Sequence, residues 1–256
     1  YVNMFDFWAW LSGTLGPGMP AKLLPVAVTV VVLLIIALRF VDRVNRGYSI
    51  KLVFLGLGLV CAIFSLALPD PRVPIKRIHV AEYIILAFLV RHTLSHRLQG
   101  TQLTLFTVLV TLLLGIHDEM LQGLHPHRYY GWLDMIVNGT AGLSGALLGH
   151  GLLCCLRPTL GTTQPRTRGL TALVTLFLLL GASSIWLVIL LYQQRGSAVS
   201  LLILLPQVVC GMLLIVLRPE IVFSSRTHHG FQAVFWLAFG LTVYPLAARL
   251  VGMDFV

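Results

Sequence analysis

Acidic side chains are scarce in this sequence: aspartate and glutamate together number nine in 256 residues. All charged residues amount to 11%, whereas a typical soluble domain contains about 25%. Hydrophobic residues make up 57% of the chain, and the mean hydropathy is +0.90. This shortage of charge excludes an ordinary soluble domain and predicts a chain that lies in a lipid bilayer.

Cysteine is also scarce, and its spacing matches no motif. Cys61, Cys154, Cys155 and Cys210 all fall inside apolar runs, without the paired spacing of a zinc site or a disulfide framework. We interpret them as small packing residues, with a redox role for the adjacent Cys154 and Cys155 as the alternative. The sequence also contains no activated nucleophile and no cofactor motif. It therefore predicts no cofactor and leaves open whether the protein is an enzyme.

The apolar residues form long runs that recur from one end of the chain to the other. Each run approaches the ~20 residues that span a hydrocarbon core as a helix, so a removable signal peptide does not explain them. The runs lack the period-two alternation of a membrane barrel. We therefore predict an all-α fold, a polytopic transmembrane bundle of about eight helices. The predicted helices are 22–41, 50–68, 79–97, 101–117, 132–156, 169–191, 199–217 and 231–251.

The segment before the first predicted helix is rich in aromatic side chains. Phe5, Phe7, Trp8 and Trp10 fall within six positions. Such a segment suits the level of the lipid head groups, or an arm that binds other membrane subunits. We divide the chain into three parts: 1–49 with this segment and the first helix, 50–156 as a helical core, and 157–256 with three additional helices.

Basic residues exceed acidic ones, and the net charge is +9. Basic residues at helix ends are the ordinary result of membrane topology, so this excess predicts no nucleic-acid partner. Of the 18 lysines and arginines, eleven lie on one side of the predicted bundle, which we expect to be cytoplasmic. Both termini would then face outward. The eleven lie in segments 39–51, 91–97, 157–168 and 218–226.

Polar residues gather where three predicted helices meet one face of the membrane. Helix 79–97 starts on the face where helix 101–117 ends and helix 132–156 begins. We predict that side chains from these helices border one polar cavity at the end bearing both termini, with a hydrogen bond or ion pair joining two of the helices. The predicted binding residues are Lys76, His79, Glu82, Tyr83, Asp118, Glu119, Gln122, Arg128, Asp134 and Asn138.

Polar groups inside membrane helices need partners, since an ionised side chain at the bilayer centre costs ~2.5–3.5 kcal/mol on insertion scales. Glu82 and Asn138 lie about one turn inside their predicted helices, so we expect both to face the bundle. Lys76, Arg77, Arg128 and the histidines are candidate partners. Arg128 is the preferred bridge because its guanidinium can engage two carboxylates at once.

Two further patterns bear on this region. His79, Glu82, His117, Asp118 and Glu119 are ligand types that zinc or manganese accepts, but they lack an HExxH-type spacing, so no metal is predicted. A simpler interpretation is that 118–131 is a short polar surface loop whose charges have no function. Small residues after Asn138, which include a GxxxG spacing, predict that helix 132–156 is central.

Two segments resemble the VanZ-like family: "KRIHVAEYIILAFL" at 76–89 and "HDEMLQGLHPHRYYGWLDMIVNGTAGLSG" at 117–145. Lys76, His79, Tyr83 and Leu86 fit the family's first motif. The second motif is fitted, in order and spacing, by Asp118, Glu119, Gln122, Arg128, Asp134 and Asn138. Ala141 stands where the family usually has glycine. The resemblance covers roughly 50–156 and leaves the last three predicted helices outside it.

The resemblance implies a bacterial inner-membrane protein of the kind found in cell-envelope, exopolysaccharide and glycopeptide-antibiotic resistance contexts, without supplying a reaction. Our first hypothesis is an outward-facing pocket that recognises or processes a lipid head group or a lipid-linked cell-envelope glycan. The second is a non-catalytic accessory subunit of a membrane complex, in which the polar residues join helices. A transporter, the third, would predict internal repeats and broken helices, and we find no convincing repeat.

Overall fold

A computed structural model describes residues 10, 13–16, 19–96, 98–123, 131–154, 170–193, 200–223 and 229–246 of the chain. Within these residues the regular elements are all helices, and no strand occurs. Of the aromatic amino-terminal segment, only the exposed Trp10 is described; Phe5, Phe7 and Trp8 lie outside the described residues.

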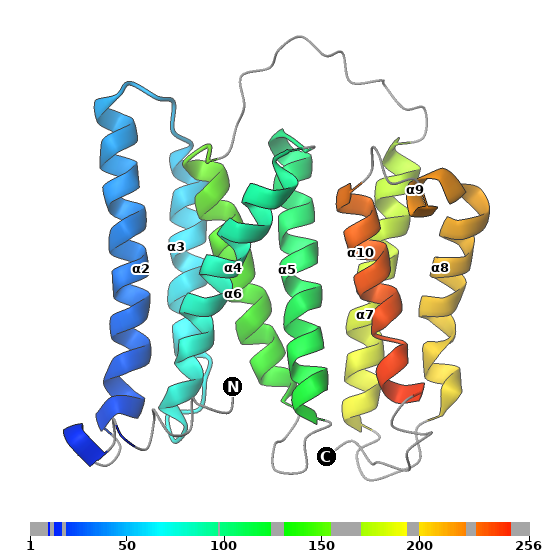
Figure 1. Ribbon diagram of the computed structural model, residues 1–256, viewed down its shortest axis with the longest axis horizontal. Coiled ribbons are helices and arrows are strands. Elements are labelled where there is room, and N and C mark those ends of the chain that lie inside the picture. The colour runs from blue at the N-terminus through cyan, green and yellow to red at the C-terminus, as the bar shows by residue number, and fades with distance from the viewer. Residues whose placement is uncertain are drawn as a thin grey trace.

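The first half of the chain forms five long helices that run in alternating directions (Figure 1). They are α2 (Met19–Asn45), α3 (Leu52–Ala67), α4 (Ile78–Leu94), α5 (Gly100–Gly123) and α6 (Trp132–Gly151). A short 3-10 helix, η1 (Pro74–Arg77), leads directly into α4. As a result, η1, the start of α4, the end of α5 and the start of α6 lie at one end of the bundle, which we call the polar end.

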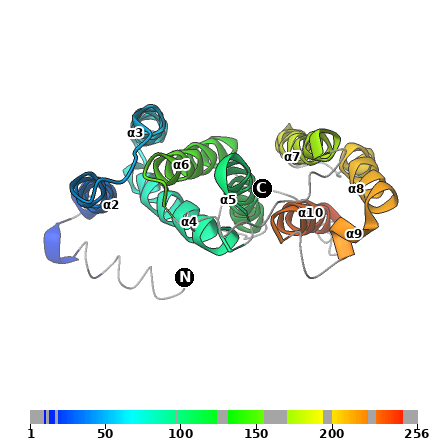
Figure 2. The same ribbon diagram turned by 90° about the horizontal axis from the view of Figure 1, so that it is seen from above.

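The second half forms a smaller group of helices beside the first (Figure 2). It contains α7 (Leu170–Gln193), η2 (Leu201–Leu204), α8 (Leu205–Leu217), α9 (Pro219–Phe223) and α10 (His229–Gly240). The two groups meet mainly where α10 packs against α5. Aromatic rings fill this contact, with Phe106 of α5 in edge contact with Phe231 of α10 at a centroid distance of 4.4 Å.

Helix α6 is the central helix of the first group, as predicted, because it packs against α3, α4 and α5. Its small residues allow this close packing. A Cβ atom added at Gly145 would lie 2.7 Å from Ala87 Cβ and 2.7 Å from the backbone oxygen of Ile84, so only glycine permits this approach to α4. Ser144, also on α6, donates a hydrogen bond to the carbonyl oxygen of Gly58 on α3 at 2.7 Å.

Among the described residues, three helices are long and apolar enough to cross a membrane: Lys22–Asn45, Gly100–Gln122 and Val174–Leu191. The outer faces of α2 and α3 leave large apolar side chains exposed, among them Leu38 at 69% and Val53 at 72%. A contiguous apolar surface of this kind is rare on soluble monomers and is typical of contact with lipid or with another protein.

Two helix ends near the predicted site differ from prediction. Helix α5 continues to Gly123 rather than ending at 117, because charged residues do not by themselves break a helix and Met120 is still buried in the core. Helix α6 ends at Gly151 rather than 156. Leu153 adopts φ +50°, and the amide of Cys154 donates to the carbonyl of Gly149 at 2.9 Å, which closes the helix.

Two helices in the second group are also shorter than predicted. Helix α8 begins at Leu205 rather than 199, because η2 occupies the preceding turn. Helix α10 ends at Gly240, where both the amide and the hydroxyl of Thr242 bond to the Phe239 carbonyl. A further helical turn follows over 243–246, and the rest of the predicted range, 247–251, lies outside the described residues.

Candidate functional site

An ion pair joins η1 to the first turn of α6 at the polar end. Lys76 Nζ donates to Asp134 Oδ2, and the Asp134 side chain is only 8% exposed. The carboxylate also lies in the first turn of its helix, where the aligned backbone dipoles favour negative charge. The pair therefore holds η1, which leads into α4, against the first turn of α6.

A second polar contact joins α4 to α5. The hydroxyl of Tyr83, a nearly buried residue, lies 3.5 Å from Asp118 Oδ2. Gln122, one turn further along α5, donates from Nε2 to the same oxygen at 3.1 Å and reaches Glu119 Oε1 at 3.5 Å. The Asp118 carboxylate thus accepts hydrogen bonds from two helices, which confirms the prediction of a polar contact between helices in this region.

His79 and Glu82 form a third contact, within the first turns of α4. His79 Nδ1 lies 3.1 Å from Glu82 Oε2. The histidine side chain is mostly covered, whereas the glutamate side chain is 45% exposed. Glu82 therefore presents its carboxylate at the surface of the bundle, where a ligand can reach it.

Two polar side chains lie deeper and have polar atoms without a described partner. Glu119 and Asn138 are both fully buried. In the described part of the chain, nothing bonds to Glu119 Oε2 or to either polar atom of the Asn138 amide. A buried polar group without a partner costs roughly 1–3 kcal/mol, so such groups are rare and call for a reason.

The position of Asn138 follows from a close approach of three helices. A Cβ atom added at Gly115 of α5 would lie 3.0 Å from Asn138 Cβ and 3.1 Å from Tyr83 Cε1. Gly115 thus lets the α4 tyrosine and the α6 asparagine approach α5 at the same level. The tyrosine links this buried level to Asp118 at the surface.

A groove of about 460 Å³ runs along the outside of this cluster, between α4 and α5. We call it the polar groove. Glu82, Tyr83 and Asp118 form its polar part, and the apolar remainder consists of Ile85, Leu86, Leu89 and Leu114. The groove therefore presents hydrogen-bonding groups beside a strip of aliphatic side chains.

The structure does not place the predicted residues around one cavity. Glu82, Tyr83 and Asp118 line the polar groove, and Glu119, Asp134 and Asn138 are buried. Lys76, His79 and Gln122 each contact a member of one of these two groups. The sequence places all of them on neighbouring helix ends, but it does not show which side of each helix faces outward. Arg128 lies outside the described residues, and its expected bridging role stays a prediction. Lys76 instead forms the ion pair that joins η1 to α6.

Two residues near the cluster have other partners. His117 turns toward α10, where Nε2 lies 2.7 Å from the carbonyl of Leu237 and Nδ1 lies 2.7 Å from the hydroxyl of Tyr244. Arg77 donates to the carbonyl of Leu66 at 3.0 Å, at the end of α3. Among the described residues, no group of three or more histidine, cysteine or acidic side chains is arranged to hold a metal ion.

Sequence reasoning missed a second polar network at the opposite end of the bundle. His150 on α6 lies 2.7 Å from Thr104 Oγ1 and 3.1 Å from Lys51 Nζ. Arg91, fully buried on α4, donates to Thr104 at 3.2 Å and to the carbonyl of Cys154 at 3.1 Å. The sequence did offer a signal, because Arg91 and His150 are polar residues within apolar runs. A polar side chain in such a run needs a partner when it is buried.

No family model, curated protein or solved structure matches this chain.

Proposed function

We propose that the chain is a multi-pass bacterial inner-membrane protein of the VanZ-like type that binds a lipid head group, or the head group of a lipid-linked cell-envelope glycan, at its polar end. The apolar surfaces of α2 and α3 support the membrane location, since lipid acyl chains would cover them. The excess of basic residues at the other end favours an outward-facing polar end.

The observation that carries this proposal is the amphipathic character of the polar groove. Glu82 and Asp118 offer carboxylate oxygens to the hydroxyl or ammonium groups of a head group. Aliphatic side chains continue directly from them along α4, as an attached acyl chain requires. Lys76 is partly exposed and has ammonium protons beyond the one donated to Asp134, which suits a phosphate.

An accessory subunit is the second candidate, and a specific observation favours it. The Lys76 and Asp134 pair and the Tyr83 and Asp118 contact each join two elements of the same chain. Contacts of this kind hold a bundle together without any ligand. A stable stoichiometric protein partner in gentle detergent would support this function.

Native mass spectrometry of the full chain tests the first proposal. The protein is purified in mild detergent and mixed separately with a polyprenyl phosphate, a polyprenyl-pyrophosphate-linked sugar and phosphatidylethanolamine. We expect one of these probes to give a saturable 1:1 adduct. Asp118→Asn and Glu82→Gln should each weaken an adduct with the sugar-linked lipid or with phosphatidylethanolamine about tenfold, because each replaces a charged acceptor for a hydroxyl or ammonium group with a neutral one.

Asp70→Asn is the matched control, since it makes the same chemical change at an exposed site between α3 and η1, outside the groove. It should leave the adduct unchanged. Carboxylates also have general-base capacity, so the mass of the released lipid reports any conversion. The proposal is wrong if none of the probes binds saturably, or if all three variants bind as the unaltered chain does.

A further inference from the structure

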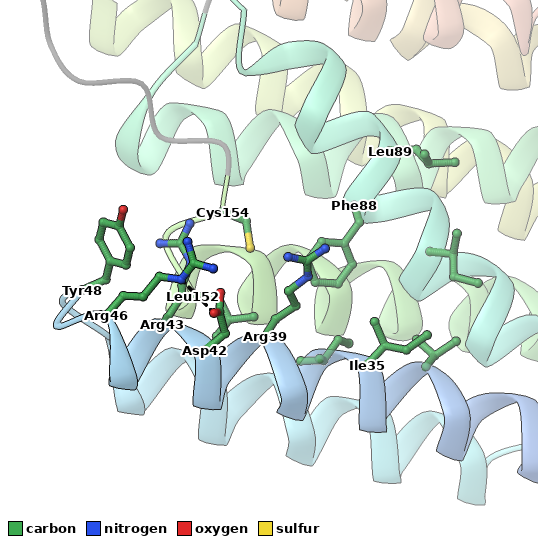
Figure 3. A pocket seen from close by; sticks show the side chains of 13 residues that line it. Ile35, Arg39, Asp42, Arg43, Arg46, Tyr48, Phe88, Leu89, Leu152 and Cys154 are labelled. Carbon is green, nitrogen blue, oxygen red and sulfur yellow. Dashed lines mark hydrogen bonds and ion pairs between the residues drawn. The ribbon is translucent and has the colours of Figure 1, made fainter.

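A second groove lies between the described helices, and its charged residues are at the end of the bundle opposite the polar end. It encloses about 590 Å³ between α2 and α4, which is within the ~300–1,000 Å³ typical of ligand sites. We call it the basic groove. Arg39, Arg43 and Arg46 line one end of it, next to Tyr48 (Figure 3).

The charges at this end do not cancel. Arg46 Nε donates to Asp42 Oδ1 at 2.8 Å, so the one acidic side chain among the described lining residues neutralises one arginine. Arg43 lies over the ring of Tyr48, with its guanidinium carbon 5.3 Å from the ring centroid. Arg39 forms no ion pair with any described residue. Two positive charges are thus available to an anion.

The rest of the basic groove is apolar. Ile35 lies one turn before Arg39 on α2, and Phe88 and Leu89 of α4 face it across the groove (Figure 3). On α2 the lining residues run from Val32 to Arg43, which is about 17 Å of helix, and Arg46 follows just beyond the end of α2. This length accommodates a charged head group and the upper part of an acyl chain.

We propose that the basic groove is a binding site for an anionic phospholipid, whose phosphate contacts Arg39 and Arg43 and whose acyl chain lies against Ile35, Phe88 and Leu89. Guanidinium groups recognise phosphate through two parallel hydrogen bonds. The arginines lie at the end that carries the excess of basic residues, and anionic lipids of the cytoplasmic leaflet attract such residues. A soluble phosphate ion would leave the apolar part of the groove unused.

This inference rests on the membrane location in the proposed function but not on the ligand of the polar groove. The two grooves share Ile85 and Leu89 as lining residues, yet their polar parts are separate. Variants of the arginines therefore test the lipid site without changing Glu82 or Asp118.

The experiment places the full chain in nanodiscs of phosphatidylcholine alone or mixed equally with phosphatidylglycerol. Native mass spectrometry after release should show phosphatidylglycerol retained in preference to phosphatidylcholine, and the mixed bilayer should raise the Tm. Arg39→Gln with Arg43→Gln should lower phosphatidylglycerol retention about tenfold. Arg39→Lys with Arg43→Lys keeps both charges and should retain part of the preference, which separates lost charge from lost folding.

Lys22→Gln with Arg72→Gln is the matched control, because it removes two exposed positive charges outside the basic groove and should leave retention unchanged. Excess inorganic phosphate should displace none of the lipid. The inference is overturned if the chain inserts into nanodiscs but shows no preference for phosphatidylglycerol. It is also overturned if Arg39→Gln with Arg43→Gln retains as much phosphatidylglycerol as the control pair does. Failure to insert at all would instead contradict the proposed membrane function.

Discussion

Lys76 and Asp134 are 58 positions apart in sequence and form an ion pair between η1 and α6. The partners differ in environment, since the lysine side chain is 39% exposed and the aspartate side chain is 8% exposed. Loss of the lysine should therefore destabilise the covered aspartate more than loss of the aspartate would destabilise the partly exposed lysine. A carboxylate that loses its cation in a covered position has no comparable partner to replace it.

Replacing Lys76 with methionine tests this dependence. We expect Lys76→Met to lower stability by roughly 1–3 kcal/mol, because the Asp134 carboxylate stays covered without its cation. Thermal unfolding in one detergent measures the effect as a lower Tm. Lys22→Met, an exposed lysine on α2, should change the Tm little. Equal effects in the two variants would show that the ion pair contributes nothing specific.

Asn138 gives a test that separates folding from ligand binding. Both polar atoms of its buried amide have no partner among the described residues. Asn138→Leu has a similar volume and removes these polar atoms, so we expect unchanged or slightly raised stability, by about 1 kcal/mol. A polar residue kept at a stability cost is typical of a functional position, so the adduct at the polar end should weaken.

The two measurements for Asn138→Leu are the Tm and the native mass spectrum with the probe that binds the unaltered chain. A large fall in Tm would contradict the first expectation. It would mean that the amide is satisfied by a group beyond the described residues. An unchanged adduct would contradict the second expectation and would limit the binding site to the polar groove.

The close packing of α6 on α4 predicts a strong effect at Gly145. Gly145→Ala places a Cβ atom against the backbone of Ile84, which cannot move as a flexible side chain can. We expect a loss of about 1–3 kcal/mol, typical of overpacking. Gly56→Ala on α3 is the matched control, since a Cβ atom there meets nothing within 4 Å and alanine favours helix. If both variants unfold at the same temperature, the α4 and α6 contact is looser than described.

The sequence predicts more of the fold than of the site, for physical reasons. Long apolar runs separated by charges and prolines locate each major helix, because hydrophobicity along the chain reports directly on helix length. The same runs misplace helix ends, as at α5, because a charge ends an apolar run without ending a helix. Hydropathy also does not show which face of a helix points inward.

The direction in which each side chain points from its helix explains which predictions about the site were confirmed and which were wrong. Tyr83 and Asp118 were expected near each other because their helix ends meet, and they do meet. His117 precedes Asp118 in sequence, yet a helical step of about 100° turns it toward α10 and away from the cluster. Its partners, Leu237 and Tyr244, lie 120 and 127 positions later, so no local pattern points to them.

The contact between His117 and Tyr244 predicts that the second group of helices supports the site through α5. Tyr244→Phe removes the hydroxyl that lies 2.7 Å from His117 Nδ1. We expect a loss of about 0.5–1.5 kcal/mol, the usual net contribution of one hydrogen bond, measured as a lower Tm in detergent. Tyr48→Phe, which removes an exposed hydroxyl at the basic groove, is the matched control and should leave the Tm unchanged.

His117→Phe should lower the Tm further than Tyr244→Phe does, because it also removes the bond to the Leu237 carbonyl at 2.7 Å. Since Asp118 is the next residue on α5, His117→Phe should also weaken the adduct at the polar groove more than Tyr244→Phe does. A normal adduct in both variants, despite a lower Tm, would show that the second group stabilises the fold without positioning the groove.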